Sequence, residues 1–192
     1  MATDVTLSCS CGALSAKLLN VGPQHGFHAS CDCDDCHATN NHHGVHDPKD
    51  TAIDLYQTSP SNLKILSGGE NLSVLRLHKS GGLLRWYAKC CDTPMYNTMA
   101  SPKLPVVGVV ASNVDSPEAL GPVRAQGFVK KGGKTTHKNM VGMLSRMIGR
   151  MARERISGRW RDTPFFDAST MEPVVTPYTL TADERTAAYQ PR

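Results

Sequence analysis

The sequence predicts a mainly β fold that carries a metal-binding cysteine module and is followed by an amphipathic helix. Several short runs have the residue pattern of β-strands, and Gly-Gly pairs at 68–69 and 81–82 separate three of them. All seven cysteines lie before residue 92 and fall into three short groups. Beyond them, residues 137–156 repeat apolar side chains with a helical period.

The strand candidates occupy the first part of the chain. Residues 13–19 alternate in the manner of a strand, and Gly22, Pro23 and Gly26 then interrupt the pattern. Because Gly-Gly turns reverse the chain between neighbouring strands, the later runs predict an antiparallel meander of consecutive hairpins. Residues 128–135 are interpreted as a basic turn. The expected strands cover residues 5–7, 13–19, 27–30, 63–66, 72–77, 83–88, 95–98 and 105–110.

The predicted helix covers residues 137–156, and Gly158 is expected to end it. We expect its methionine-rich face to pack on the sheet and its arginines to be solvated. The alternative is a surface for an acidic partner, of which nucleic acid is disfavoured because aromatic residues are not interleaved. The proline-containing tail after Trp160 is expected to run extended over the surface. The apolar stripe consists of Met140, Val141, Met143, Leu144, Met147, Ile148, Met151 and Ile156, with Arg146, Arg150, Arg153 and Arg155 among them.

Charge divides the chain of 192 residues into two parts. Residues 1–100 carry 7 Lys/Arg and 9 Asp/Glu, whereas residues 101–192 carry 14 and 8. A basic balance of this kind indicates a basic face or arm in the second part. We therefore predict a zinc-binding β domain over residues 1–130 and a basic helical extension with a proline-containing tail over residues 131–192.

The expected compartment is the cytoplasm. The opening residues MATDVTLSCSCG lack the basic and apolar regions of a secretory signal, and the longest apolar run, residues 104–111, is too short to span a bilayer. In a reducing compartment, cysteines are free thiols or metal ligands more often than disulfides. The odd number of cysteines also argues against a closed disulfide framework.

The cysteine spacing is typical of zinc sites. Thiolates are polarisable anionic ligands that suit zinc, and structural zinc sites have four protein ligands whereas catalytic ones keep a position open. Seven thiols suit one four-ligand and one three-ligand site, hence one or two Zn²⁺ per chain. Burial of the cysteines as small apolar residues is the alternative. The groups are a C-x-C-G motif (Cys9, Cys11), a C-x-C-x-x-C triplet (Cys31, Cys33, Cys36) and an adjacent pair (Cys90, Cys91).

Four histidines follow the triplet, at His37, His42, His43 and His46. Gly44 lies between His42 and His46, and Asp47-Pro48 follows, so a long helix that carries both of these histidines is not expected. We expect a polar loop with solvated histidines. The alternative is that one neutral imidazole completes or borders the metal site.

The order of these motifs resembles the glutathione-dependent formaldehyde-activating (Gfa) family, which includes centromere protein V. The resemblance spans residues 5–115 and rests on C-S-C-G-A-L from Cys9, C-D-C-D-D-C from Cys31 and C-D-T-P-M from Cys91. It implies an Mss4-like (β-tent) zinc-binding fold and carbon–sulfur lyase chemistry on small thiol adducts such as S-hydroxymethyl glutathione. By resemblance, a structural zinc is held by Cys9, Cys11 and Cys91, and a reactive zinc by Cys31, Cys33 and Cys36.

The third motif departs from the family pattern C-x-x-C-G. Ala88 stands at the first ligand position, and Asp92 replaces the glycine. Adjacent cysteines chelate one tetrahedral ion only with a strained ring, so Cys91 is the predicted ligand and the role of Cys90 is left open. Aspartate tolerates left-handed backbone better than most residues.

Three hypotheses for function follow. In the first, the triplet zinc of an enzyme binds the sulfur of a small thiol substrate, and His28, His37 or Asp35 transfers a proton; spacing does not choose among these three. In the second, a non-catalytic zinc module uses its basic helix to bind an acidic protein, nucleic acid or membrane. In the third, the triplet is a redox or metal-exchange site. The sequence leaves open whether the protein is an enzyme.

Overall fold

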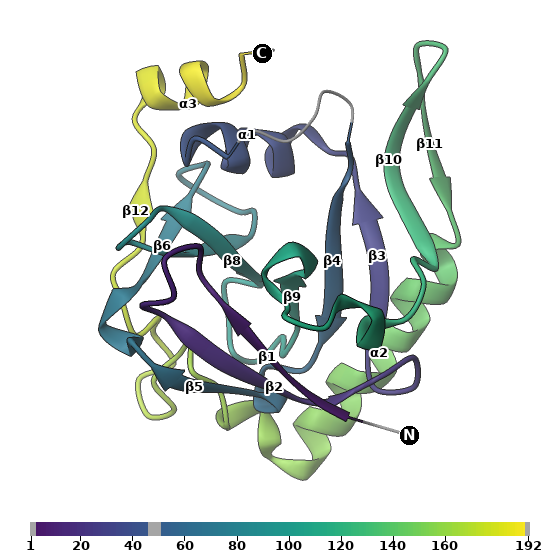
Figure 1. Ribbon diagram of the computed structural model, residues 1–192, viewed down its shortest axis with the longest axis vertical. Helices are drawn as coiled ribbons and strands as arrows, with labels where there is room; N and C mark the ends of the chain where they lie inside the picture. The colour runs from purple at the N-terminus through teal and green to yellow at the C-terminus, as the bar shows by residue number, and fades with distance from the viewer. Residues whose placement is uncertain (1–2, 46–50, 191–192) are drawn as a thin grey trace.

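The described residues form twelve strands in two β-sheets, so the prediction of a mainly β fold is confirmed (Figure 1). The computed structural model describes residues 3–45 and 51–190. The smaller sheet has the order β1-β2-β5, formed by β1 (Thr3–Ser8), β2 (Ser15–Val21) and β5 (Leu63–Ser67). Figure 1 shows it crossing beneath the larger sheet.

The larger sheet has the order β11-β10-β3-β4-β9-β8-β7-β6-β12 within the described residues. Neighbouring strands of this sheet run antiparallel, except that β10 runs parallel to β3 and β12 runs parallel to β6. Its strands are β3 (Phe27–Cys31), β4 (Ile53–Thr58), β6 (Leu72–Arg76), β7 (Leu84–Ala88), β8 (Thr93–Thr98), β9 (Val107–Val110), β10 (Ala125–Lys131), β11 (Lys134–Lys138) and β12 (Tyr178–Thr179).

The predicted antiparallel meander is confirmed for β6, β7, β8 and β9, which pair consecutively. Gly81 and Gly82 lie in the connection between β6 and β7, with φ values of 73° and 74°. Glycine adopts this left-handed backbone without the steric cost that a Cβ would add. The second Gly-Gly pair therefore makes the hairpin that the sequence predicts.

The first Gly-Gly pair does not make a hairpin, and this part of the prediction is wrong. β5 pairs with β2 of the smaller sheet, whereas β6 belongs to the larger one. A Cβ on Gly68 would lie 1.8 Å from the carbonyl oxygen of Ala13. The glycine therefore allows close backbone contact with the turn between β1 and β2, at the point where the chain leaves β5 for the larger sheet. A glycine turn signals a change of direction, but it does not specify the strand's partner.

Besides the short β12 of the C-terminal tail, two parts of the larger sheet were not predicted. β4 lies between β3 and β9, and its Ile53 and Leu55 are buried. Residues 128–135, interpreted as a basic turn, belong to the hairpin of β10 and β11. The side chains of β11 are exposed along its whole length, so it lacks the apolar alternation by which strands are recognised.

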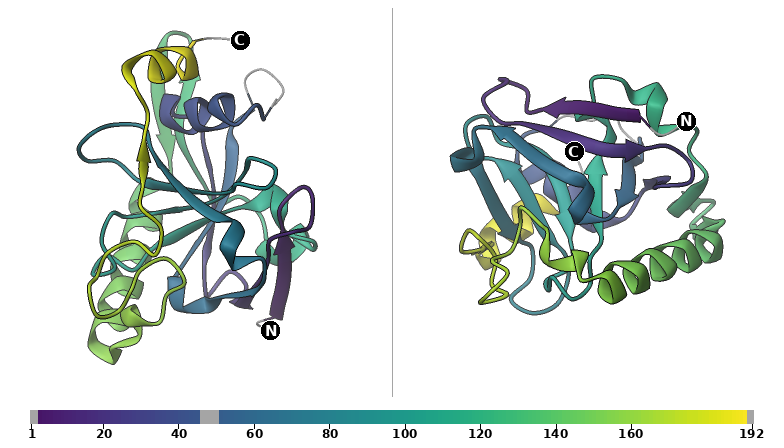
Figure 2. Two further views of the ribbon diagram at one scale, coloured as in Figure 1. Left: turned by 90° about the vertical axis from the view of Figure 1, so that its left-hand side faces the viewer. Right: turned by 90° about the horizontal axis from the view of Figure 1, so that it is seen from below.

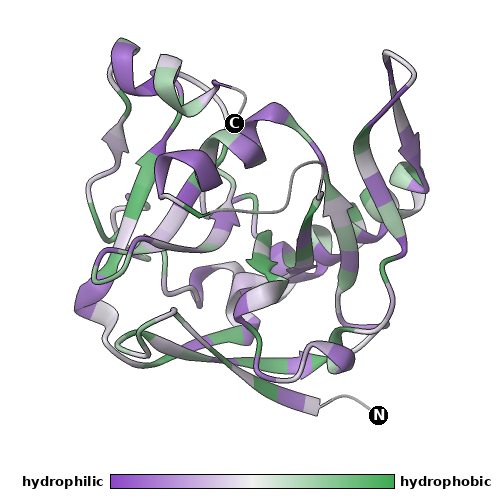
Figure 3. Cartoon of the chain, turned by 45° about the horizontal axis from the view of Figure 1, so that its top comes forward, coloured by the Kyte–Doolittle hydropathy of each residue, from purple (hydrophilic) through white to green (hydrophobic). Residues whose placement is uncertain are grey.

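The main core lies between the two sheets. Leu7 and Leu18 of the smaller sheet are fully buried, as is Trp86 of the larger sheet. The ring of Phe165, from the C-terminal part of the chain, lies 4.9 Å from Trp86 and 5.3 Å from Tyr96 between ring centroids. Figure 3 shows the alternating apolar and polar bands along the strands that produce this core.

The amphipathic helix is present as α2 (Met140–Ser157), but its orientation differs from the expectation. Met143 packs against Phe27 as expected. The helix, however, also buries Arg150 and Glu154. Much of the expected apolar stripe is exposed, at Val141, Leu144, Ile148 and Ile156. Periodicity identifies a helix, but it does not tell which of two adjoining faces is covered.

The C-terminal tail is more ordered than the expected extended segment. It contributes β12 to the larger sheet and ends in α3 (Ala182–Ala188), which begins with a capping box between Thr181 and Glu184. Asn41 of α1 (Asp34–His42) donates a hydrogen bond of 3.0 Å to the carbonyl of Ala188. Figure 2 shows the tail running up one side of the molecule to this contact. The division into domains at residue 130 stays a prediction.

No helix among residues 3–45 and 51–190 is long and apolar enough to cross a membrane.

Replacing Phe165 by alanine is expected to lower the free energy of unfolding by about 3–5 kcal/mol, because the change leaves a cavity beside Trp86. Urea denaturation at a fixed metal concentration measures it. Val174→Ala, in the same tail at a half-exposed position, is the control and should change stability by less than about 0.5 kcal/mol. Equal effects of the two changes would mean that the tail adds nothing specific to the core.

Candidate metal centres

The fold gathers all seven cysteines into two clusters, and all seven are free thiols. In each cluster the sulfur atoms all lie within 4.8 Å of one another. The knuckle cluster consists of Cys9, Cys11, Cys90 and Cys91, and the triplet cluster consists of Cys31, Cys33 and Cys36.

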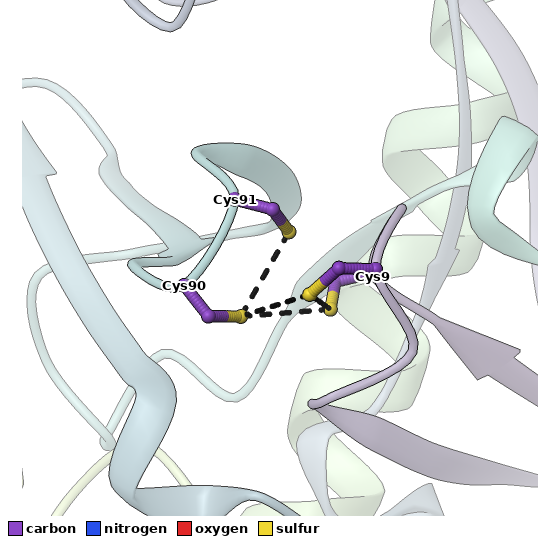
Figure 4. Close-up of side chains that lie close together, drawn as sticks. Cys9, Cys90 and Cys91 are labelled. Atoms are coloured by element: carbon purple, nitrogen blue, oxygen red, sulfur yellow. Dashed lines mark hydrogen bonds between the residues drawn. The ribbon is translucent and has the colours of Figure 1, made fainter.

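The sulfur separations of the knuckle cluster fit a tetrahedral metal ion. Cys9 Sγ lies 3.6 Å from Cys11 Sγ and 3.8 Å from Cys90 Sγ, and Cys90 Sγ lies 3.4 Å from Cys11 Sγ and 3.8 Å from Cys91 Sγ. A tetrahedron with zinc–sulfur bonds of about 2.3 Å has sulfur–sulfur edges of about 3.8 Å. Figure 4 shows the sulfurs of Cys9, Cys90 and Cys91 converging on one point. The donor set is that of a closed four-thiolate site.

Two tight turns present these thiols. In the first, directly after β1, Gly12 has a left-handed φ of 76°, and the backbone N–H of Leu14 donates to Cys9 Sγ at 3.3 Å. In the second, between β7 and β8, the N–H of Cys91 donates to the carbonyl of Ala88 at 3.2 Å. Asp92 closes this turn with a φ of 53°, the left-handed backbone expected at the glycine position of a C-x-x-C-G pattern.

Cys90 is the residue whose role the sequence left open. Its sulfur lies closer to Cys11 than Cys9 does, and Figure 4 shows it facing the same point as Cys91. The expected ring strain does not keep the two sulfurs apart, since the turn that Asp92 closes places them 3.8 Å from each other. The sequence did contain the signal: with Ala88 at the missing ligand position, Cys90 was the single unassigned thiol.

The two adjacent thiols differ in acidity. Desolvation raises the pKa of Cys91, but hydrogen bonding with Ser10 and Thr93 outweighs it and brings the pKa to about 5. Desolvation and the thiols of Cys11 and Cys9 raise the pKa of Cys90 to about 12. Binding a cation at this cluster therefore requires Cys90 to release a proton, so affinity should fall as the pH is lowered.

The triplet cluster lies at the junction of β3 and α1. Cys31 ends β3, Cys33 occupies the N-cap position of α1, and Cys36 lies in its first turn. The sulfurs of Cys31 and Cys33 are 3.4 Å apart. In the described part of the chain, no histidine, aspartate or glutamate atom joins these three sulfurs as a fourth ligand.

The histidines after the triplet have other contacts. His37 Nε2 lies 2.7 Å from Asp32 Oδ1, and the ring of His43 packs at 4.4 Å on Tyr87. Burial lowers the pKa of His43 to about 4. The expected polar loop is wrong over residues 37–42, which belong to α1; Asp34 and Asp35 in the first turn favour this helix. His46 lies outside the described residues.

Arg85, a buried arginine of β7, contacts the triplet cluster. Arg85 Nη1 donates to Cys36 Sγ at 3.5 Å and to Asn97 Oδ1 at 3.2 Å, and Asp35 lies 3.8 Å from Arg85 Nη2. Hydrogen bonds from Cys31 and Cys33, together with the Arg85 charge, hold the pKa of Cys36 well below its ordinary value. The pKa of Cys31 is raised, because its thiol donates to the other two sulfurs.

The three candidates for proton transfer differ in position. Asp32 lies between Cys31 and Cys33 in the chain, and His37, whose ring contacts Asp32, directly follows Cys36. Asp35 accepts a hydrogen bond from Tyr189 of the C-terminal tail, whose hydroxyl also lies 3.1 Å from His78 Nε2. His28 belongs to neither cluster, and its Nδ1 lies 2.7 Å from the carbonyl of Gly121.

Two thiol clusters with metal-ligand geometry on a mainly β scaffold define a metal-binding class of protein. The chain belongs to the family described as "Family of unknown function (DUF6151)", whose model matches residues 1–175. No curated protein matches. A crystal structure of a Rhodobacter sphaeroides protein is similar at 22% identity and a TM-score of 0.42, over 62% of this chain and 96% of that one.

Replacing Cys90 by serine is expected to weaken metal binding at the knuckle cluster by more than about 100-fold, because a hydroxyl is a poor substitute for a thiolate. Cobalt(II) titration, followed by the thiolate-to-metal charge-transfer band, measures this. Cys33→Ser is the matched control, since it should weaken only the other cluster. A Cys90→Ser protein that binds two metal ions as tightly as the wild type would exclude Cys90 as a ligand.

Asp92→Ala is expected to lower the free energy of unfolding by about 1 kcal/mol, because alanine tolerates a φ of 53° less well than aspartate. Asp92→Gly should not lower it, since glycine adopts this backbone readily. Chemical denaturation at saturating zinc compares the two variants. Equal losses for alanine and glycine would point to the aspartate side chain, rather than the backbone, as the stabilising feature.

Proposed function

We propose that this protein binds two zinc ions with different roles. The knuckle zinc is structural, and the triplet zinc binds the sulfur of a small thiol adduct. The observation that carries this proposal is the difference in donor number: four thiols at tetrahedral separations in one cluster, and three without a fourth protein ligand in the described residues of the other. Closed sites of the first kind are structural, whereas an exchangeable position accompanies catalysis.

The proposed reaction is carbon–sulfur bond cleavage in an adduct such as S-hydroxymethyl glutathione. The hydroxyl proton of the adduct passes to a base, a carbonyl bond forms as the carbon–sulfur bond breaks, and the sulfur leaves as a thiolate. The products are formaldehyde and glutathione, and no oxidant or reductant is needed. A zinc ion held by the triplet would supply a Lewis acid for that thiolate.

His37 is the base that we assign to this step. It lies directly after Cys36 in the chain, and its ring is oriented by Asp32, in the manner of a histidine held by a carboxylate. Asp35 is less suited, because the Tyr189 hydroxyl and the Arg85 guanidinium already engage its carboxylate. We assign Arg85 a positioning role. Its positive charge compensates the triplet thiolates on the side where Cys36 is buried.

A second candidate function is a non-catalytic zinc module whose basic helix binds an acidic partner. The exposure of Val141, Leu144 and Ile148 on α2 favours it, because apolar side chains beside exposed arginines suit an interface. Binding to a nucleic acid that weakens steeply with added salt would support this function. Such binding with no effect of glutathione on the bound zinc would favour it over the lyase.

The lyase proposal predicts that wild-type protein accelerates exchange between formaldehyde and its glutathione adduct. Cys33→Ser should lose one of two zinc ions and the acceleration. His37→Gln should keep both zinc ions and slow the exchange by at least about 100-fold, the usual contribution of a general base. Plasma mass spectrometry counts the zinc, and exchange spectroscopy by proton NMR gives the rate.

His42→Gln is the matched control, because it removes a histidine from the same helix that does not bond to Asp32. Its exchange rate should equal that of the wild type. Two tightly bound zinc ions that glutathione does not affect, together with an unaccelerated exchange, would contradict the lyase proposal. Equal slowing by His37→Gln and His42→Gln would contradict the assignment of His37.

A further inference from the structure

A cleft of about 620 Å³ lies between α2 and two segments of the sheets. One wall comes from the last two turns of α2, and the other from the end of β2, the turn that follows it, and residues 59–62 after β4. Figure 1 places α2 at the opposite end of the molecule from α1, which carries the triplet cluster. This volume falls in the range of small-molecule pockets. The cleft is therefore a candidate binding site separate from both thiol clusters.

The lining is basic. It includes Arg150, Arg153 and Arg159 against the single acid Glu154, a net charge of +2 with histidine taken as neutral. Glu154 accepts a hydrogen bond of 2.8 Å from Ser61 and lies 3.9 Å from Arg159 Nε. Arg159 thus compensates the charge of Glu154. The positive charges of Arg150 and Arg153 have no compensating carboxylate in the lining.

Arg150 is buried to more than nine-tenths, and its Nε and Nη2 have no hydrogen-bond partner in the described part of the chain. Leaving these two N–H groups buried and unpaired is costly, because they lose hydrogen bonds to water and gain none to the protein. Burial lowers the pKa of Arg150, as do the charges of Arg153 and Arg146, although Tyr56 opposes them. The surroundings of this side chain therefore favour an added negative charge.

Arginines in the last turns of a helix often serve only to offset its terminal carbonyl groups. Arg153 does not do so, since its Nε donates at 3.2 Å to the carbonyl of Gly149, which lies in the middle of the helix. Arg150 does not fit this explanation either, because its Nε and Nη2 have no acceptor among the described residues. The neutral polar side chains of the lining, such as Asn62 and Ser59, add hydrogen-bonding groups that an ester or hydroxyl could use.

We infer that this cleft binds a small phosphorylated molecule, whose phosphomonoester dianion is held by Arg150 and Arg153. A phosphomonoester carries close to two negative charges at neutral pH, which matches the net charge of the lining. The planar guanidinium group suits the tetrahedral oxygens of phosphate through paired hydrogen bonds. The inference does not depend on zinc chemistry and stands apart from the proposed lyase.

The test is calorimetric titration of the zinc-loaded protein with inorganic phosphate and with glycerol 2-phosphate, at an ionic strength fixed with sodium chloride. One saturable site is expected, with tighter binding of the ester. Arg153→Gln, at an exposed position, should fold normally and weaken binding by about tenfold or more, as expected for a hydrogen bond to a charged group. Arg150→Met should abolish binding; its melting temperature in chloride shows whether it is folded.

Arg155→Gln is the matched control, because it removes the same charge from the same helix outside the cleft, where Arg155 donates to the carbonyl of Lys103. It should leave affinity within about twofold of the wild type, the range of a screened surface charge. The inference is overturned if neither phosphate compound shows saturable binding, or if Arg155→Gln weakens binding as much as Arg153→Gln. Binding of succinate as tight as that of glycerol 2-phosphate would also overturn it, since the site would then select dicarboxylates.

Discussion

The convergence of four sulfurs from two distant turns is the constraint on which the fold depends most. Cys9 and Cys11 follow β1 of the smaller sheet, whereas Cys90 and Cys91 connect β7 to β8 of the larger one. A metal ion at this point would join the two sheets at the edge of the core that contains Leu7 and Trp86. Because aromatic residues make up only 6% of the chain, such a cross-link would add stability that apolar burial alone provides less readily.

The two thiol clusters differ in the way the chain balances their charge. The knuckle cluster is partly exposed and receives hydrogen bonds from backbone and hydroxyl groups, as Thr93 illustrates at 3.1 Å from Cys91. The triplet has Arg85 behind it, at 3.5 Å from the buried Cys36. Three thiolates and one divalent ion would carry a net charge of −1, which Arg85 opposes although it also lies 3.8 Å from the Asp35 carboxylate. Under the proposed function, a position for one more ligand would suit the exchange of an external thiol.

The features that depend on local sequence pattern were predicted, and those that depend on tertiary contacts were not. The C-x-C motifs, the alternation of residues 83–88 and the helical period of α2 are local, and each was recognised. The partner of β5, the buried face of α2 and the position of Cys90 depend on segments far apart in the chain. Arg85 was part of a predicted strand, but no sequence spacing connects it with Cys36, which lies 49 residues away.

The central claim, one closed and one open thiolate site, is tested most directly by X-ray absorption at the zinc edge of protein loaded with two zinc ions. Seven sulfurs shared by two ions should give about 3.5 sulfurs per zinc at about 2.3 Å, completed by a light atom. Added glutathione should raise the average to about 4. An average of about 3.5 or less that glutathione leaves unchanged would contradict the open site, and a single bound zinc with four sulfurs would exclude it.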